Sequence, residues 1–191
     1  MIDAVGFIQR LNRTKTLSLK LTNVLMEAFR TNRFEAQETF LSPGNYASSI
    51  YYIENGLVRG AIEGSAEKIT TWFKQNGSLI IPQGLINQQP SGEYISAVTK
   101  TSLIALPFKS LKTIGETIPE VMELLVLLVA ETATEAQYRE KLLRLPAAKD
   151  RYNFLSENED FILKRIPNYL AASYLNVTKE TFSRLHKGLP Y

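Results

Sequence analysis

The residues best suited to chemistry lie near the end of the chain, between Asn168 and Lys187. Polar and charged side chains recur there at three- and four-residue spacing, which places them on one face of a helix. Arginine can donate two hydrogen bonds to guanine, glutamate can accept one from cytosine, and lysine pairs with phosphate. The stretch therefore predicts a surface that contacts DNA, with the candidate residues Thr178, Lys179, Glu180, Thr181, Ser183, Arg184 and Lys187.

The elements that must position this face read as a helix-turn-helix. Ala172 is the small residue where two helices can approach closely, and Phe182 lies on the inner side of the second helix. Asn176 stands at the turn, where a residue that tolerates positive φ is needed. Thr178 is an N-cap that defines where the second helix begins. A helical pair with a solvated charged face, unrelated to DNA, is the alternative interpretation.

The charge is distributed unevenly along the 191 residues. The net charge is +3, but residues 1–136 carry −1 and residues 137–191 carry +4. A basic surface in a small C-terminal unit favours an acidic partner such as nucleic acid. The chain has no cysteine and one histidine, His186, which excludes disulfides, cysteine-ligated clusters and multi-histidine metal sites. We therefore expect no cofactor.

Short β-branched and aromatic runs separated by turn signals extend from about residue 39 to residue 106 and predict an antiparallel barrel or jelly roll. The Asn55-Gly56 pair predicts a tight hairpin between two of these strands. The expected strands lie at residues 50–53, 57–59, 69–73, 94–98 and 103–106, and a helix is expected over residues 17–29.

A single long helix is predicted between Pro119 and Pro146, because no other proline or glycine interrupts this stretch. Its first half is apolar around most of its circumference. One stripe can pack on the barrel and another on a second copy of the chain, so we expect a homodimer through residues 119–145. Burial of the whole helix within one chain is the alternative.

A β-barrel, a long helix and a tail reading Val177-Thr178-Lys179-Glu180-Thr181-Phe182-Ser183-Arg184 together resemble the cyclic-AMP receptor and fumarate-nitrate regulator (Crp/Fnr) family of bacterial transcription factors. The resemblance covers nearly the whole chain. It implies an α+β fold with an N-terminal cyclic-nucleotide-binding-like β jelly roll, a long dimerisation helix and a C-terminal helix-turn-helix. The corresponding domains are residues 1–118, 119–145 and 146–191.

What the resemblance implies for function is a homodimeric, sequence-specific transcriptional regulator bound to a palindromic operator. Glu180 and Arg184 would read base pairs and Lys179 would support them. The family also admits RNA polymerase as a further partner. A ligand-sensing or protein-interaction scaffold whose helical tail does not read DNA is the alternative.

The chain departs from the family pattern in three places. The family's nucleotide-contacting Gly-Glu-Leu and Arg-Ser-Ala segments correspond to Gly77-Ser78-Leu79 and Ser91-Gly92-Glu93, so the glutamate and the arginine are missing. A phosphate buried without a cation is costly, and we expect no binding of cyclic AMP. Neither the cysteines nor the sensor histidine of the oxygen- and haem-sensing branches is present. The wing of the helix-turn-helix is reduced or absent.

Other possibilities concern the barrel and the N-terminal segment. The loop at residues 76–92 borders either a pocket for an uncharged effector or a filled core, and the effector is unknown. Enzymatic activity of the cupin type is not expected, because the barrel has no histidine. Charged residues interrupt the first apolar stretch, so we expect no signal peptide, no membrane span and a cytoplasmic location.

Overall fold

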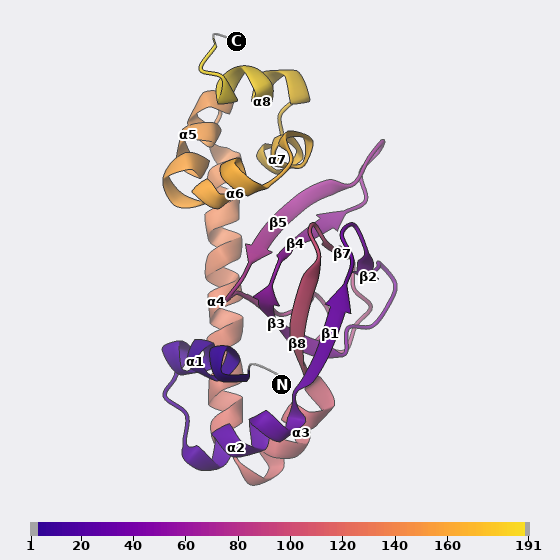
Figure 1. Cartoon of the computed structure of the whole chain (residues 1–191), viewed down its shortest axis with the longest axis vertical. Helices are drawn as coiled ribbons and strands as arrows, with labels where there is room; N and C mark the ends of the chain where they lie inside the picture. The colour runs from indigo at the N-terminus through magenta and orange to yellow at the C-terminus, as the bar shows by residue number, and fades with distance from the viewer. Residues whose placement is uncertain (1–3, 190–191) are drawn as a thin grey trace. The chain divides into compact units, whose positions relative to one another are not determined.

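The computed structural model describes residues 4–189 and combines antiparallel β-sheets with helices. The chain folds into two compact units, and residues 61–73 of the β-region belong to the C-terminal unit. The first unit comprises residues 4–60 and 74–132, and the second comprises residues 61–73 and 133–189. In Figure 1 the colour of the helices and strands follows their order along the chain, from indigo to yellow.

Two four-stranded sheets make up the β-structure, with the orders β1-β8-β3-β6 and β2-β7-β4-β5. This confirms the predicted antiparallel β-roll. The strands are β1 (Arg30–Phe34), β2 (Thr39–Leu41), β3 (Ser49–Asn55), β4 (Leu57–Ile62), β5 (Ile69–Gln75), β6 (Leu79–Ile80), β7 (Tyr94–Ala97) and β8 (Thr101–Pro107). The inward-facing side chains of β3 and β8 form much of the core, and Ile50, Ile53 and Leu103 are almost completely buried. Each such burial stabilises the fold by roughly 1.5–3 kcal/mol.

The tight hairpin predicted at Asn55-Gly56 is wrong. Gly56 does have a positive φ of 116°, but Asn55 does not, and β3 and β4 lie in different sheets. A Cβ atom on Gly56 would lie 2.3 Å from Oγ1 of Thr101. The glycine is needed because the backbone passes close to β8 as the chain crosses from one sheet to the other, not because two strands pair across it.

The helices are α1 (Ala4–Thr14), α2 (Leu19–Ala28), α3 (Phe108–Thr117), α4 (Glu120–Arg144), α5 (Ala148–Asn158), α6 (Asp160–Arg165), α7 (Asn168–Leu175) and α8 (Lys179–His186). The predicted long helix is confirmed as α4. Its side chains Val121, Leu124 and Leu128 are buried within the first unit. Among residues 4–189, no helix is long and apolar enough to cross a membrane.

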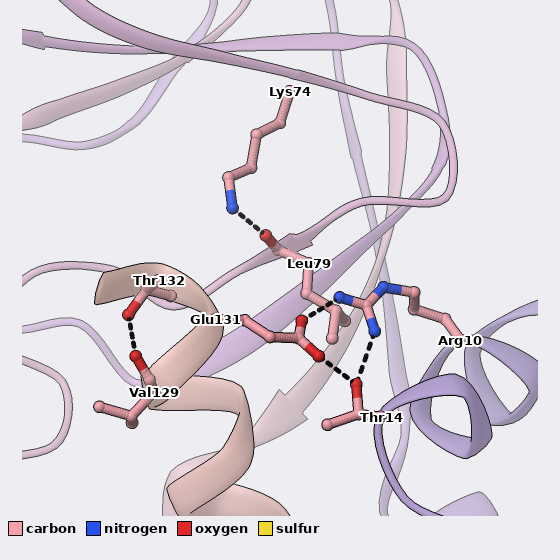
Figure 2. Close-up of polar contacts among 7 residues, drawn as sticks. All are labelled: Arg10, Thr14, Lys74, Leu79, Val129, Glu131 and Thr132. Atoms are coloured by element: carbon pink, nitrogen blue, oxygen red, sulfur yellow. Dashed lines mark hydrogen bonds and ion pairs between the residues drawn. The ribbon is translucent and has the colours of Figure 1, made fainter. Parts of the chain in front are cut away.

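A polar contact ties α1 to α4 in the first unit (Figure 2). The Arg10 guanidinium forms an ion pair with Glu131, and Arg10 Nη1 also donates to Thr14 Oγ1 at 2.8 Å. Burial acts to raise the pKa of Glu131, but hydrogen bonds from Arg10 and Thr14 and the charges of Arg10 and Lys74 outweigh it and hold that pKa below its usual value. Glu131 therefore stays ionised and holds the N-terminal helix against α4.

Candidate nucleic-acid interface

The predicted helix-turn-helix is confirmed as α7, a short turn and α8. Asn176 adopts the left-handed conformation with φ 51° and ψ 52°. The next residue, Val177, donates its N–H to the carbonyl of Ala172 at 3.1 Å, so the carbonyls at the end of α7 are satisfied. Asparagine tolerates this conformation better than other non-glycine residues, which explains its place at the turn.

The start of α8 is fixed by its N-cap, as expected. Thr178 Oγ1 accepts the backbone N–H of Thr181 at 3.1 Å and donates to Thr181 Oγ1 at 3.0 Å. The two threonines predicted to bind DNA are thus both engaged in defining where the helix begins. Such a cap is worth about 1 kcal/mol.

An apolar contact between the helices holds α8 in place. Ala172, Leu175 and Phe182 are almost completely buried. The Phe182 ring stacks on His186 with centroids 5.7 Å apart, and His186 Nδ1 lies 3.0 Å from the Tyr152 hydroxyl on α5. The single histidine is exposed and packs on Phe182 at the surface of the helical unit, a role that the sequence did not reveal.

The candidate side chains of α8 divide into two groups by exposure. Lys179, Glu180, Arg184 and Lys187 are exposed, as is Thr178, whereas Thr181 and Ser183 are half-buried. Among residues 4–189, the side chains of Glu180, Arg184 and Lys187 form no hydrogen bond or ion pair with another residue. The face that they form, here called the reading face (Thr178, Lys179, Glu180, Thr181, Ser183, Arg184 and Lys187), leaves its charged side chains available to a partner.

Further basic residues lie before α7. Lys164 and Arg165, at the end of α6, and Asn168, at the start of α7, are exposed. Lys164 forms an ion pair with Asp160 one turn earlier. These side chains place hydrogen-bond donors at the start of the helix-turn-helix.

Sequence reasoning missed the segment Ala61–Phe73, which belongs to the helical unit. The Thr70 N–H donates to Ser173 Oγ on α7 at 3.0 Å. The Phe73 ring meets the Tyr174 ring edge to face, with centroids 5.5 Å apart. No local pattern signals this contact, because its partners lie about a hundred residues apart in the sequence.

A buried ionic cluster was also missed. The Arg139 guanidinium lies over the Tyr174 ring, 3.8 Å from its centroid, and donates to the Tyr174 carbonyl. The Tyr174 hydroxyl donates to Glu159 Oε2 at 2.9 Å. Burial raises the pKa of Glu159 and lowers that of Arg139, and the same burial together with Glu159 raises the pKa of Tyr174. The cluster joins α4, α7 and the α5–α6 junction at Glu159.

The loop that the family resemblance assigns to nucleotide contact contains a nearly buried carboxylate, Glu93. Glu93 is 8% exposed, and its Oε1 accepts the backbone N–H of Gln83 at 3.0 Å. The Glu93 N–H in turn donates to Ser91 Oγ at 3.1 Å. A backbone donor of this loop is therefore occupied by the chain's own carboxylate.

No cluster of histidine, cysteine, aspartate and glutamate able to hold a metal ion occurs in the part of the chain that the structure describes. The exposed side chains of the reading face offer hydrogen-bond donors, acceptors and charges. The reading face lies on a capped helix that follows a tight turn and carries exposed basic and acidic side chains.

Neither a protein-family model nor a curated protein matches the sequence. Solved structures do match over most of the chain. FixK2 from Bradyrhizobium japonicum has a TM-score of 0.73 at 19% identity, over 84% of this chain and 83% of its own. The c-di-GMP responsive global regulator CLP from Xanthomonas campestris has a TM-score of 0.69 at 14% identity, over 90% and 91%.

The catabolite activator protein of Thermus thermophilus also matches, with a TM-score of 0.59 at 19% identity, over 94% of this chain and 85% of its own. These neighbours are regulators of the Crp/Fnr type rather than enzymes. The resemblance read from the sequence is thus confirmed in three dimensions: this chain has the Crp/Fnr fold, with a cyclic-nucleotide-binding-type β-roll followed by C-terminal helices.

Proposed function

We propose that this protein is a dimeric, sequence-specific DNA-binding transcriptional regulator. The observation that carries the proposal is the reading face: α8 begins at a capped position after a left-handed turn, and its charged side chains are exposed. The fold that this chain shares with regulators of transcription supports its assignment to the class of transcriptional regulators. In this proposal residues 1–118 form the regulatory domain, 119–145 the dimerisation helix and 146–191 the DNA-binding domain.

Within the reading face, chemistry divides the roles. Arg184 has the fork of donors that fits guanine, and Glu180 has the acceptor that fits cytosine. Lys179 and Lys187 neutralise phosphates on either side. Thr178, Thr181 and Ser183 add hydroxyl groups near the backbone of the DNA.

Dimerisation through α4 is supported by the spacing of its exposed side chains. Met122, Val126, Val129, Ala133 and Ala136 follow each other at intervals of four and three residues, and all are exposed. This is the a/d spacing of a coiled coil, and we call these five residues the α4 seam. Val126 is 66% exposed, which is costly for an apolar side chain that stays in water. A second copy of the chain would cover the seam, and two recognition helices would then face two half-sites of a palindrome.

The regulatory domain does not bind cyclic AMP in this proposal. A cyclic phosphate brought to the loop would meet the buried Glu93 carboxylate instead of a cation, and the Gln83 N–H would have to leave Glu93 to reach the phosphate. Both changes oppose binding, because like charges in a buried site repel strongly.

The test is selection of DNA from a random duplex pool by the purified protein. We expect an enriched palindrome with half-sites about one helical turn apart. Arg184→Ala should weaken binding of that site by about 1–3 kcal/mol and relax one base position. Lys187→Ala should weaken all sequences equally and reduce the salt dependence.

Arg144→Ala is the matched control, since Arg144 is an exposed arginine of α4 that pairs with Glu140. It should leave selection unchanged. Failure of the wild-type protein to enrich any sequence would contradict the proposed function. If Arg184→Ala weakens every sequence by the same factor, Arg184 contacts phosphate and does not read a base.

A further inference from the structure

Both backbone polar groups of Thr70 hold the segment Ala61–Phe73 in the helical unit, the N–H through α7 and the carbonyl through α4. Thr70 is 1% exposed. Its N–H donates to Ser173 Oγ at 3.0 Å, and its carbonyl lies 3.5 Å from Nη2 of Arg139. With the Phe73 ring packed on Tyr174, this end of the segment is firmly anchored. The residues that precede Thr70 in this segment are therefore kept close to α7 and α8.

The loop that precedes Thr70 is acidic. Residues 62–68, here called the hairpin tip, run from the last residue of β4 to the start of β5 and contain Glu63, Glu67 and Lys68, a net charge of −1. Glu67 Oε2 lies 3.8 Å from Nζ of Lys179, the first residue of α8. A wing that assists DNA binding is usually basic, because it must approach phosphates. Because the hairpin tip has a net negative charge, we expect it to oppose DNA binding.

The tip meets α8 across open space and not through a packed interface. A groove of about 390 Å³ separates them, lined by Glu67, Lys68 and Ile69 on one side and by residues of α7, the turn and the start of α8 on the other. The side chains of Glu67 and Lys179 are 69% and 56% exposed. The ion pair at this groove can therefore be exchanged for another partner without disrupting a core.

We propose that the hairpin tip is an autoinhibitory contact on the reading face, in which Glu67 occupies Lys179 until a DNA phosphate displaces it. The proposal rests on the proposed DNA-binding function. Lys179 would contact the DNA backbone at the start of the recognition helix, where the helix dipole also favours an anion. Glu67 and the phosphate compete for the same cation, so each DNA contact at this site requires release of the intramolecular pair.

The expected effect is modest, because exposed ion pairs are weak. Replacing Glu67 by glutamine should tighten binding to duplex DNA about two- to fivefold at low salt, and the gain should shrink as salt is added. Glu63→Gln removes the same charge from the same tip and is the matched control. It should change affinity by less than about twofold, because the ion pair between the tip and Lys179 is made by Glu67.

The experiment measures dissociation constants by fluorescence anisotropy for the wild type, Glu67→Gln and Glu63→Gln. The probe is a mixed-sequence 30-base-pair duplex, used together with any site enriched by selection. All variants are also made in a Lys179→Gln background, where exchange through Lys179 cannot occur. The gain from Glu67→Gln should be absent there. Thermal unfolding followed by circular dichroism verifies that each variant is folded.

The possible outcomes separate the two proposals. If the wild type binds and Glu67→Gln binds no tighter, the autoinhibitory contact is wrong while the DNA-binding function stands. An equal gain in the Lys179→Gln background also overturns it, because the effect is then general repulsion. If neither protein binds any duplex, both proposals fail, whereas binding by Glu67→Gln alone supports the contact.

Discussion

Replacing Arg139 by methionine should destabilise the helical unit by about 3 kcal/mol. The Arg139 guanidinium lies 3.8 Å from the centroid of the buried Tyr174 ring, an interaction worth up to about 2 kcal/mol when desolvated. Its loss also leaves the Tyr174 carbonyl without this donor, which costs about 1–3 kcal/mol for a buried group. Methionine restores part of the lost packing and so offsets some of this cost. The half-buried Glu159 carboxylate would at the same time lose a nearby positive charge.

The single tryptophan of the chain makes this measurable, because Trp72 lies in the segment that belongs to the helical unit. Its fluorescence during urea unfolding therefore reports on that unit. A loss of about 3 kcal/mol should lower the urea midpoint by about 1–3 M. Arg144→Met is the matched control on the same helix: Arg144 is exposed and pairs with the exposed Glu140, so its midpoint should barely move.

A double-mutant cycle with Glu159→Gln isolates the charge interaction. If Arg139 stabilises the ionised Glu159, the two substitutions together should cost less than their sum by about 1 kcal/mol or more. An Arg139→Met midpoint close to that of Arg144→Met would refute the reasoning that the buried guanidinium organises this unit. Additive costs would show that the charge of Glu159 is not part of its role.

Three further expectations follow from named contacts. Asn176 has φ 51°, a conformation in which a Cβ is costly. In thermal unfolding, Asn176→Gly should therefore stabilise the protein and Asn176→Ala should destabilise it by about 1 kcal/mol. Equal stabilities of the two variants would contradict a left-handed turn. Val126→Asp should weaken self-association in sedimentation equilibrium by about 100-fold or more, since two valines per dimer would leave the α4 seam, whereas Leu127→Asp, exposed but outside the seam, should have a much smaller effect. Burial raises the pKa of Glu159, so the folded state binds the proton of this carboxyl more tightly than the unfolded chain does. The wild type should therefore lose stability relative to Glu159→Gln as pH rises above 4.5. A constant difference in melting temperature between the two proteins from pH 4 to pH 7 would contradict the raised pKa.

Interactions between near neighbours in the chain were predictable from residue type. The cap on α8 joins Thr178 to Thr181, and the turn satisfies α7 through Ala172 and Val177. Such contacts span three to five residues, so the residues that make them must stand at fixed positions in the sequence. The long helix α4 was predictable for a similar reason, because helix-breaking residues stand only at its ends.

Strand pairing was harder to predict. Asn55-Gly56 has the composition of a hairpin turn, yet the flanking strands pair with distant segments in two different sheets. Strand β1 (Arg30–Phe34) was missed, because it is an edge strand whose mostly exposed side chains show no apolar alternation. Its place is set by its backbone hydrogen bonds to β8, about seventy residues away.

The sequence by itself determined the helix-turn-helix, its charged face and the long helix α4, since these depend on local geometry and helical period. Only the tertiary structure decided that Thr70 pairs with Ser173, that Arg139 lies on Tyr174, and that Glu67 stands beside Lys179. Each of these contacts joins segments separated by tens of residues or more. Their partners are selected by packing, which leaves no periodic signal in the chain.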